Sequence, residues 1–333
     1  MSKVFFIKHN FLSKLERALQ KLDLASLKGK RVAIKLHMGE YGNLNYIRPP
    51  IAGKIVEVLK KAGAEPFLID STTLYRAKRF TPKGYLDTAR RNGFTEETVG
   101  CPIVISNEPV QKEGKLFQVG VIKEIAEADA LLVLTHCKGH MFSGLGGAIK
   151  NLGMGAVDSK TKKVCHSKGF PLIDLQKCIG CGGCEKSCDF GAISIKEGKA
   201  QVNYSACWGC LKCMKACPEK AISPKECLPD HALASSALSV LECFDKKDLL
   251  FVNILTDISA KCDCASNAPF ASVQNIGFLV SQDILAIENA SVDLILKQSP
   301  GFFDKLGYRG PKQQIDWLEK QGYGRPDYEL EEV

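Results

Sequence analysis

The sequence lacks any apolar stretch of the roughly 18 residues that a membrane-spanning helix needs. Its first residues, Met1 to Lys8, are interrupted by charge too soon to form a secretory signal. It also lacks a lysine- and arginine-rich run and any recognisable nucleic-acid-binding module, although 45 basic and 37 acidic residues give a net charge of +8. We therefore expect a cytoplasmic protein with no membrane span and no nucleic-acid partner.

Cysteine, in contrast, is abundant, with 15 in a chain of 333 residues. In a secreted protein so many cysteines would indicate disulfides, but the chain shows no secretory signal. In a reducing cell, closely spaced cysteines are more typical of metal ligands. The sequence therefore predicts metal centres.

Eight cysteines fall in two runs that share the spacing C-x2-C-x2-C-x3-C. The first run holds Cys178, Cys181, Cys184 and Cys188, and the second holds Cys207, Cys210, Cys213 and Cys217. With this spacing a tight turn aims three thiolates at one cubane, and the fourth cysteine, at the start of the next short helix, reaches the other cluster. The sequence thus predicts two [4Fe–4S] clusters. Their ligands would be Cys178, Cys181, Cys184 and Cys217 for cluster I, and Cys207, Cys210, Cys213 and Cys188 for cluster II.

The segment that carries these runs resembles a bacterial two-cluster ferredoxin. The tetrapeptides that end at Ser194 and Ser223 follow the runs as an internal repeat, and residues 192–196 and 200–203 predict a β-hairpin between them. Asp189 stands where the ferredoxin family usually has proline, and because all eight cysteines are present we do not expect it to replace a ligand. Zinc held by paired C-x2-C elements is the alternative metal, but zinc chemistry does not require two four-cysteine runs.

The rest of the chain alternates strand and helix patterns. Strands are expected at residues 4–7, 31–36, 66–70, 103–105, 130–134 and 249–255, and helices at 49–62, 82–92, 232–242 and 284–296. This alternation predicts an α/β fold with a mostly parallel sheet. Because the pattern resumes after the cysteines, we expect one α/β domain made of residues 1–170 and 227–333, with an inserted α+β ferredoxin-like 2[4Fe–4S] module at 171–226. We expect the tail from 322 to 333 to be a peripheral extension.

Several polar clusters follow the expected strands, where open α/β sheets bind ligands. The candidate catalytic residues are His37, Glu40, His136, Lys138, His140 and Lys150. Each histidine also has an ordinary alternative as a hydrogen-bonded or packing residue, and Gly139 argues against a helical metal pair of His136 and His140. The glycine-rich stretch 144–155 matches no nucleotide motif, but it permits close approach of an anionic ligand to Lys150.

Cys262 and Cys264 form one further close pair of cysteines. They are either an additional metal pair or small buried side chains, and we favour the second interpretation.

Together these motifs resemble the DUF362 family of iron–sulfur-centre proteins over nearly the whole chain. The matching pieces are residues 34–43, 136–140 and 146–155, the two cysteine runs, residues 262–264, and residues 281–287, in which Ile284 replaces the family's usual proline. The resemblance implies the architecture and the iron–sulfur centre. It does not imply a particular reaction.

Three functions are compatible with these features. The first is an electron carrier or redox subunit that moves electrons through two clusters to or from a site or partner at the α/β domain. The second is a complete oxidoreductase with a substrate or second-cofactor site in that domain, where a histidine is the expected proton donor. The third is a ligand- or metal-binding protein whose clusters are structural. The sequence identifies neither the redox partner or small-molecule substrate nor the oligomeric state.

Overall fold

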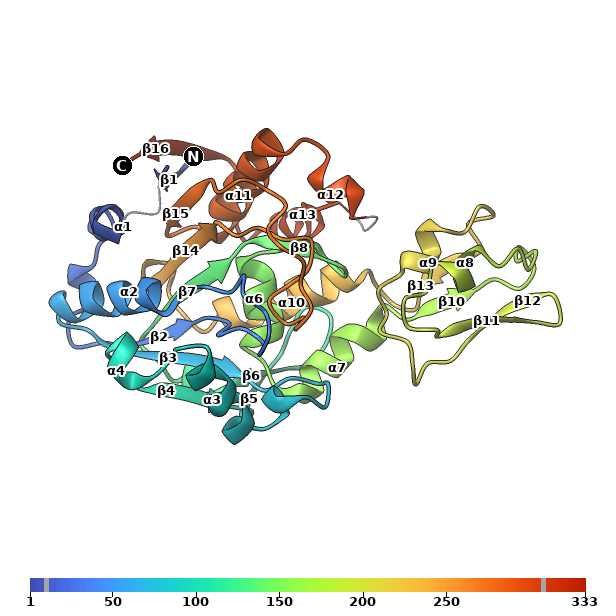
Figure 1. Ribbon diagram of the computed structural model, residues 1–333, viewed down its shortest axis with the longest axis horizontal. Coiled ribbons are helices and arrows are strands. Elements are labelled where there is room, and N and C mark those ends of the chain that lie inside the picture. Colours follow the sequence, from blue (N-terminus) through green and yellow to red (C-terminus); the bar gives the residue numbers. More distant parts are fainter. Residues whose placement is uncertain (9–11, 307–309) are drawn as a thin grey trace.

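An eight-stranded sheet runs through the main body of the protein (Figure 1). The computed structural model describes residues 1–8, 12–306 and 310–333. In sheet order the strands are β16 (Tyr328–Glu332), β1 (Ser2–Ile7), β15 (Gly277–Ser281), β14 (Leu249–Leu255), β7 (Ala130–His136), β2 (Arg31–Lys35), β3 (Glu65–Ser71) and β4 (Ile103–Ser106). Strand β15 is antiparallel to both of its neighbours, and the other seven run in one direction. The predicted mostly parallel α/β fold is confirmed.

The two central strands are apolar because the sheet is covered on both faces. Every residue of β7 and of β14 is buried, as expected for parallel strands between two helical layers. Along β7, Leu132 and Leu134 belong to one core, whereas Leu131 and Val133 belong to the other. This alternation follows from the two-residue period of a strand.

Helices form a layer on each face of the sheet. One layer contains α1 (Leu12–Leu19), α2 (Pro49–Lys61), α3 (Pro82–Arg91) and α4 (Glu96–Val99). The other contains α5 (Lys123–Ala126), α6 (Ala148–Gly155), α10 (Pro229–Leu241), α11 (Ile284–Gln298), α12 (Phe302–Lys305) and α13 (Gln313–Lys320). Helix α7 (Ser159–Lys168) packs beside α10.

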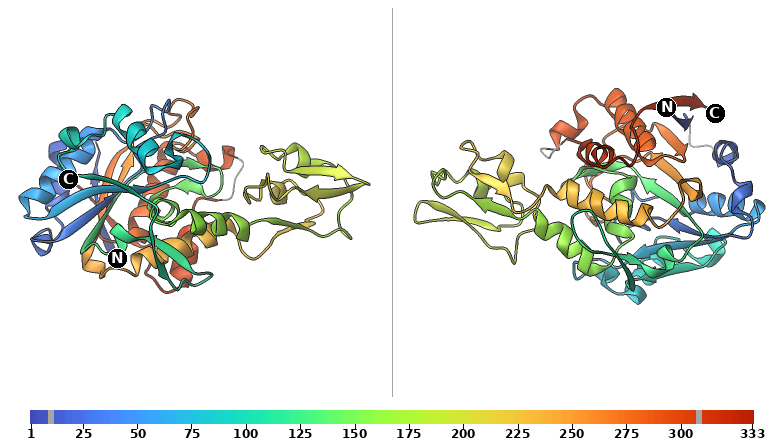
Figure 2. Two further views of the ribbon diagram at one scale, coloured as in Figure 1. Left: turned by 90° about the horizontal axis from the view of Figure 1, so that it is seen from below. Right: turned by 180° about the vertical axis from the view of Figure 1, so that it is seen from behind.

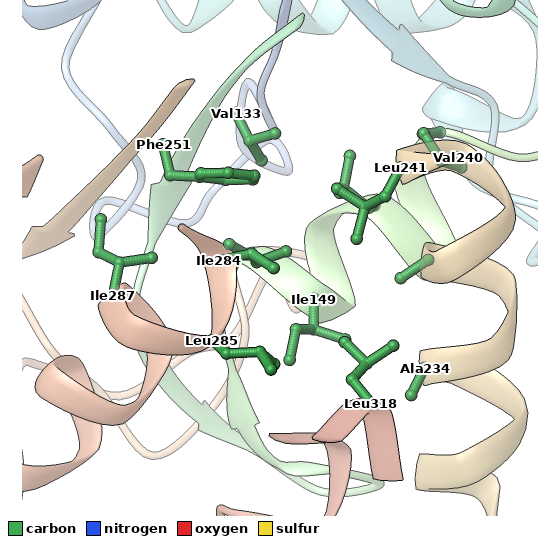
Figure 3. Close-up of a cluster of buried hydrophobic side chains, with 14 of the residues drawn as sticks. Val133, Ile149, Ala234, Val240, Leu241, Phe251, Ile284, Leu285, Ile287 and Leu318 are labelled. Atoms are coloured by element: carbon green, nitrogen blue, oxygen red, sulfur yellow. The ribbon is translucent and has the colours of Figure 1, made fainter. Parts of the chain in front are cut away.

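The core of the second layer is shown in Figure 3. Its labelled side chains are Val133, Ile149, Ala234, Val240, Leu241, Phe251, Ile284, Leu285, Ile287 and Leu318. They come from two central strands and four helices, so this core fixes the position of α6, which forms the second part of the glycine-rich stretch 144–155.

Short elements complete the main body. They are the hairpins β5 (Pro109–Lys112) with β6 (Val119–Ile122) and β8 (Lys138–His140) with β9 (Gly144–Gly146), and the 3-10 turns η1 (Ala25–Leu27), η2 (Lys78–Phe80) and η3 (Lys246–Asp248). No helix in the described parts of the chain is both long and apolar enough to span a bilayer.

The strands and helices expected for the α/β body are present, with ends displaced by no more than three residues. The tail is a partial exception. It was expected to be peripheral, but its last residues form β16, which pairs in parallel with β1 from Ser2 opposite Tyr328 and extends the edge of the main sheet.

The cysteine-rich segment is an insertion that projects from one end of the main body (Figures 1 and 2). Its elements are β10 (Pro171–Ile173), α8 (Gly183–Lys186), β11 (Ile193–Lys196), β12 (Lys199–Val202), α9 (Lys212–Lys215) and β13 (Ile222–Pro224). Strand β10, at the start of the insertion, pairs antiparallel with β13, at its end. The chain therefore enters the insertion from α7 and leaves it toward α10 at the same place. Strands β11 and β12 form the expected hairpin.

One detail of the cysteine runs differs from expectation. The third cysteine of each run, Cys184 or Cys213, lies inside the short helix, and the fourth follows the helix instead of starting it. The reason is that a single left-handed residue, Gly182 or Leu211, separates the second cysteine of each run from the first residue of the helix.

The contact between α6 and α10 gives a test of the packing. A Cβ added to Gly153 would stand 2.2 Å from the carbonyl oxygen of Leu233, and this backbone cannot yield without separating the helices. We therefore expect Gly153→Ala to lower the free energy of unfolding by about 1–3 kcal/mol, measured by chemical denaturation. Gly324→Ala is the control, because its Cβ would meet Leu285 at an ordinary contact distance of 3.5 Å. Equal stability of the two variants would contradict this packing.

Candidate functional site

A pocket opens where β2, β3 and β7 end and where the chain continues beyond β14. It encloses about 1150 Å³, including its open mouth. The ends of parallel strands meet at one edge of the sheet, and residues separated in sequence therefore share this pocket. Of the six candidate residues, His37, His136, Lys138, His140 and Lys150 line it. Glu40 contributes indirectly, through Arg79 on the pocket wall.

Arg79 joins two of the candidates. Its Nε donates to Glu40 Oε2 over 2.9 Å, and its Nη1 lies 2.9 Å from His37 Nε2. Burial holds the pKa of His37 well below its ordinary value, and the Arg79 charge lowers it further. Because a guanidinium can only donate, Nε2 of His37 accepts from Arg79 and cannot deliver a proton in this arrangement. Arg79 lies in the short turn η2 and belongs to no recognisable motif, so no sequence pattern pointed to it.

His136 is held at both ring nitrogens. Its Nδ1 lies 2.8 Å from Asp263 Oδ1, and its Nε2 lies 2.8 Å from the carbonyl oxygen of Thr256. The Lys138 ammonium donates to the other oxygen of Asp263 over 2.9 Å. Burial alone would raise the pKa of Asp263, but the charges of His136 and Lys138 outweigh it and hold the pKa below its ordinary value. These contacts fasten the loop after β14 to β7 and β8, and they leave His136 occupied by protein atoms.

His140 lies with the close pair of cysteines. A ring nitrogen of His140 and the sulfurs of Cys262 and Cys264 all lie within 4.8 Å of one another, a group that is able to hold a metal ion. The Lys150 ammonium donates to Cys262 Sγ over 3.1 Å. A hydrogen bond from Cys264 holds the pKa of Cys262 well below its ordinary value, and the Lys150 charge also lowers it. The structure therefore favours the metal-pair interpretation of the two cysteines over the one we preferred from sequence.

The pocket wall is rich in basic side chains. They are Lys35, Arg79, Lys138, Lys150 and Lys162, of which the first three are paired with the carboxylates of Asp70, Glu40 and Asp263. Lys35 is paired with Asp70 at 2.9 Å, whereas Lys162 donates to Ser71 Oγ over 2.7 Å and to the carbonyl oxygen of Thr72. Such a wall suits an anionic ligand.

In the inserted segment, a second and smaller cavity collects cysteines from both runs. The cysteines that line it are Cys178, Cys181, Cys184 and Cys217. Backbone amides donate to two of these sulfurs: Ala200 N–H to Cys178 over 3.4 Å, and Ala221 N–H to Cys217 over 3.3 Å. Four thiols around one cavity, with N–H donors directed at the sulfurs, fit the donor set of a [4Fe–4S] cluster.

The remaining cysteines of the two runs lie near one another in the same way. Burial raises the pKa of Cys207, and the neighbouring thiols of Cys210 and Cys188 raise it further. The backbone amide of Ala192 donates to the sulfur of Cys188 over 3.3 Å, and that of Gly209 donates to the sulfur of Cys207 over 3.4 Å. The fourth cysteine of the first run thus lies beside the second run, and this set also fits a cluster.

Asp189 has a separate partner. Both of its carboxylate oxygens lie 3.0 Å from the Lys212 ammonium, in a pair that joins the two halves of the insertion.

A row of aromatic rings connects the pocket to the second cysteine run. Ring centroids are 5.6 Å apart between His140 and Phe142, 5.0 Å between Phe142 and His166, and 5.3 Å between His166 and Trp208. His166 Nδ1 also lies 2.9 Å from the Trp208 carbonyl oxygen. Trp208 follows Cys207 directly, so the set containing Cys207 is adjacent to the pocket wall.

Lys162, on the pocket wall, is expected to make the free energy of unfolding of the protein depend on pH. Burial lowers its pKa from 10.5 to about 7. Between these values the unfolded chain binds a proton that the folded chain does not, and stability therefore rises with pH across this window. From about pH 7 to about pH 9, we expect the free energy of unfolding to rise by roughly 2–3 kcal/mol relative to Lys162→Met.

The control is Lys163→Met, which removes an exposed lysine from the same helix. It should follow the wild-type pH trend in chemical denaturation. Parallel pH profiles for the wild type and the Lys162 variant would show that Lys162 is not neutral in the folded protein.

Comparisons with known proteins place the chain in a family. No curated protein matches it at a significant level. Among solved structures, it is similar to the lactate racemase apoprotein from Thermoanaerobacterium thermosaccharolyticum, with 12% sequence identity and a TM-score of 0.43. The match covers 89% of this chain and 58% of that one, so the chain spans less than two thirds of its length. The model of the family described as "Domain of unknown function (DUF362)" matches residues 32–293. The chain belongs to the DUF362 family, as its motifs predicted.

Proposed function

We propose that this is an iron–sulfur redox protein that carries electrons through two [4Fe–4S] clusters to or from a site in the α/β pocket. Residues 171–226 would form the ferredoxin-like domain. Cluster I would be held by Cys178, Cys181, Cys184 and Cys217, and cluster II by Cys207, Cys210, Cys213 and Cys188. The observation that carries the proposal is the small cavity whose cysteines come three from one run and one from the other.

The arrangement of thiols argues for clusters over zinc. Structural zinc takes four ligands at about 2.0–2.3 Å, most often as two C-x2-C pairs. Here the thiols of three closely spaced cysteines are joined by Cys217, which lies 33 residues beyond Cys184. That crossed set is the one a two-cluster ferredoxin requires, and when bound each cluster supplies a one-electron reducible centre.

The two cysteine sets differ in their distance from the pocket. Trp208, which follows Cys207 of the proposed cluster II set, contacts His166, and both side chains line the pocket. The cluster I set lies toward the β11–β12 hairpin, since Gly180 packs against the hairpin turn at Gly198. Ile179 is 64% exposed there. We therefore place an outside redox partner at the cluster I end and the internal acceptor or donor at the pocket.

A complete oxidoreductase is the second candidate, and the basic pocket favours it. Basic side chains of the pocket wall, with Lys150 next to Cys262, would bind a small anionic substrate beside the candidate metal group of His140 and the two cysteines. The third possibility, clusters that only brace the fold, differs from both because such clusters would not be reduced at an accessible potential.

Iron content and electron paramagnetic resonance test the proposed clusters. After anaerobic reconstitution we expect about eight irons per chain and two interacting signals during stepwise reduction. Bound zinc in place of iron, or iron for one cluster only, would overturn the ligand assignment. Clusters that resist reduction at every accessible potential would favour the structural role.

The crossed ligand sets can be tested separately. Cys217→Ser should remove cluster I and Cys188→Ser should remove cluster II, and each should leave about four irons and a single signal without magnetic interaction. Cys243→Ser is the control, because Cys243 lies outside both runs and donates to the Ser239 carbonyl oxygen. Loss of cluster II in Cys217→Ser, or of cluster I in Cys188→Ser, would contradict the assignment of each fourth cysteine to the cluster of the other run.

A further inference from the structure

We propose a third metal centre in this protein: a mononuclear site of His140, Cys262 and Cys264 that takes one divalent late first-row transition-metal ion. Its fourth coordination position faces the basic pocket. Binding of the ion depends only on these residues, whereas its electronic connection to the clusters rests on the proposed function.

The spacing of the three side chains fits such an ion. Their ligand atoms all lie within 4.8 Å of one another. In a tetrahedral site with metal–sulfur bonds of about 2.3 Å, two sulfurs stand about 3.8 Å apart. The two sulfurs therefore need to approach each other by about 1 Å at most, and each sulfur needs to approach the histidine nitrogen by slightly more. Two thiolates and an imidazole are soft ligands, the kind that selects zinc, iron, cobalt or nickel over magnesium or calcium.

The histidine is oriented by Ser143. The Ser143 hydroxyl donates its proton to the Leu145 carbonyl oxygen over 2.7 Å, so toward His140 it is left to accept. Nδ1 of His140 lies 3.0 Å from this hydroxyl, and the Phe142 amide also donates toward Nδ1 over 3.3 Å. A metal ion at Nε2 would select the tautomer in which Nδ1 carries the proton and donates to Ser143, in place of accepting from the Phe142 amide. This is the usual arrangement of a metal-binding histidine, whose other ring nitrogen is fixed by a protein oxygen.

The two ligand-bearing segments are locked together. The Gly139 amide donates to the Ser259 carbonyl oxygen over 2.9 Å, and a Cβ at Gly139 would stand 2.7 Å from the Ala260 carbonyl oxygen. Between the two cysteines, Asp263 is held by His136 and Lys138. A site built this way keeps Cys262 and Cys264 beside His140 before any ion binds, which lowers the cost of binding.

The surroundings indicate what completes the coordination. His140, Cys262 and Cys264 all line the pocket, as do Lys138 and Lys150. Three protein ligands with one open position is the arrangement of catalytic metal sites, where water or substrate takes the fourth place. The basic wall favours a small anion there, such as a carboxylate. If the cluster II assignment holds, the row from His140 through Phe142 and His166 to Trp208 links this ion to cluster II.

The test uses the full chain with its clusters in place and Co²⁺ as the probe. After anaerobic reconstitution and removal of loosely bound metal, we expect one Co²⁺ per chain in addition to the cluster iron. X-ray absorption at the cobalt edge should show two sulfur neighbours and one histidine nitrogen from the protein. The double variant Cys262→Ser/Cys264→Ser should lose the cobalt and keep its iron. Cys101→Ser, which removes a buried cysteine elsewhere, should keep both.

Two further variants separate this site from the clusters and from simple misfolding. Ser143→Ala removes only the group that orients His140, and it should weaken Co²⁺ binding about tenfold with unchanged iron. Cys188→Ser should lose cluster II iron yet still bind one Co²⁺, so failure of the cluster proposal would leave this result intact. Absence of a cobalt–sulfur site in the wild type, cobalt retained in the double variant, or a disulfide between Cys262 and Cys264 in the anaerobic protein would overturn the proposal.

Discussion

The inserted segment depends on an exchange of cysteines between its two halves. Cys217 of the second run lines the cavity of the first, and Cys188 of the first run lies beside Cys207 of the second. Each half therefore places a thiol beside those of the other half, and the insertion has only a small apolar core of its own. Clusters bound across both halves would add their binding free energy to this fold.

The position of the insertion on the main body brings its second cysteine run close to the pocket. Because β10 pairs with β13, the insertion meets the main body at the ends of α7 and α10. A Cβ at Gly209 would stand 2.2 Å from the His166 carbonyl oxygen, so the second run can approach α7 this closely only with glycine at that place. The pocket's contacts, Arg79 with His37 and Asp263 with His136, are likewise made by buried side chains. The cysteine-rich insertion and the pocket of the main body thus share one wall.

Sequence patterns predicted the parts of this structure that are local. Apolar runs and helix ends located β7, β14 and α2, and cysteine spacing predicted which thiols would meet. The pattern did not reveal α6, because the five glycines in residues 144–155 lower the helix propensity, whereas burial of Ile149 and Leu152 stabilises the helix in the folded protein. It also did not join His140 to Cys262, because these residues lie 122 positions apart and meet only when the loop after β14 folds over β8.

The crossed cysteine sets are tested most directly by anomalous diffraction at the iron edge, from crystals of the anaerobically reconstituted protein. Two compact iron peaks are expected. One would lie among Cys178, Cys181, Cys184 and Cys217, and the other, nearer Trp208, among Cys207, Cys210, Cys213 and Cys188. A single iron peak, or peaks at the zinc edge between C-x2-C pairs, would contradict a two-cluster redox module facing the pocket.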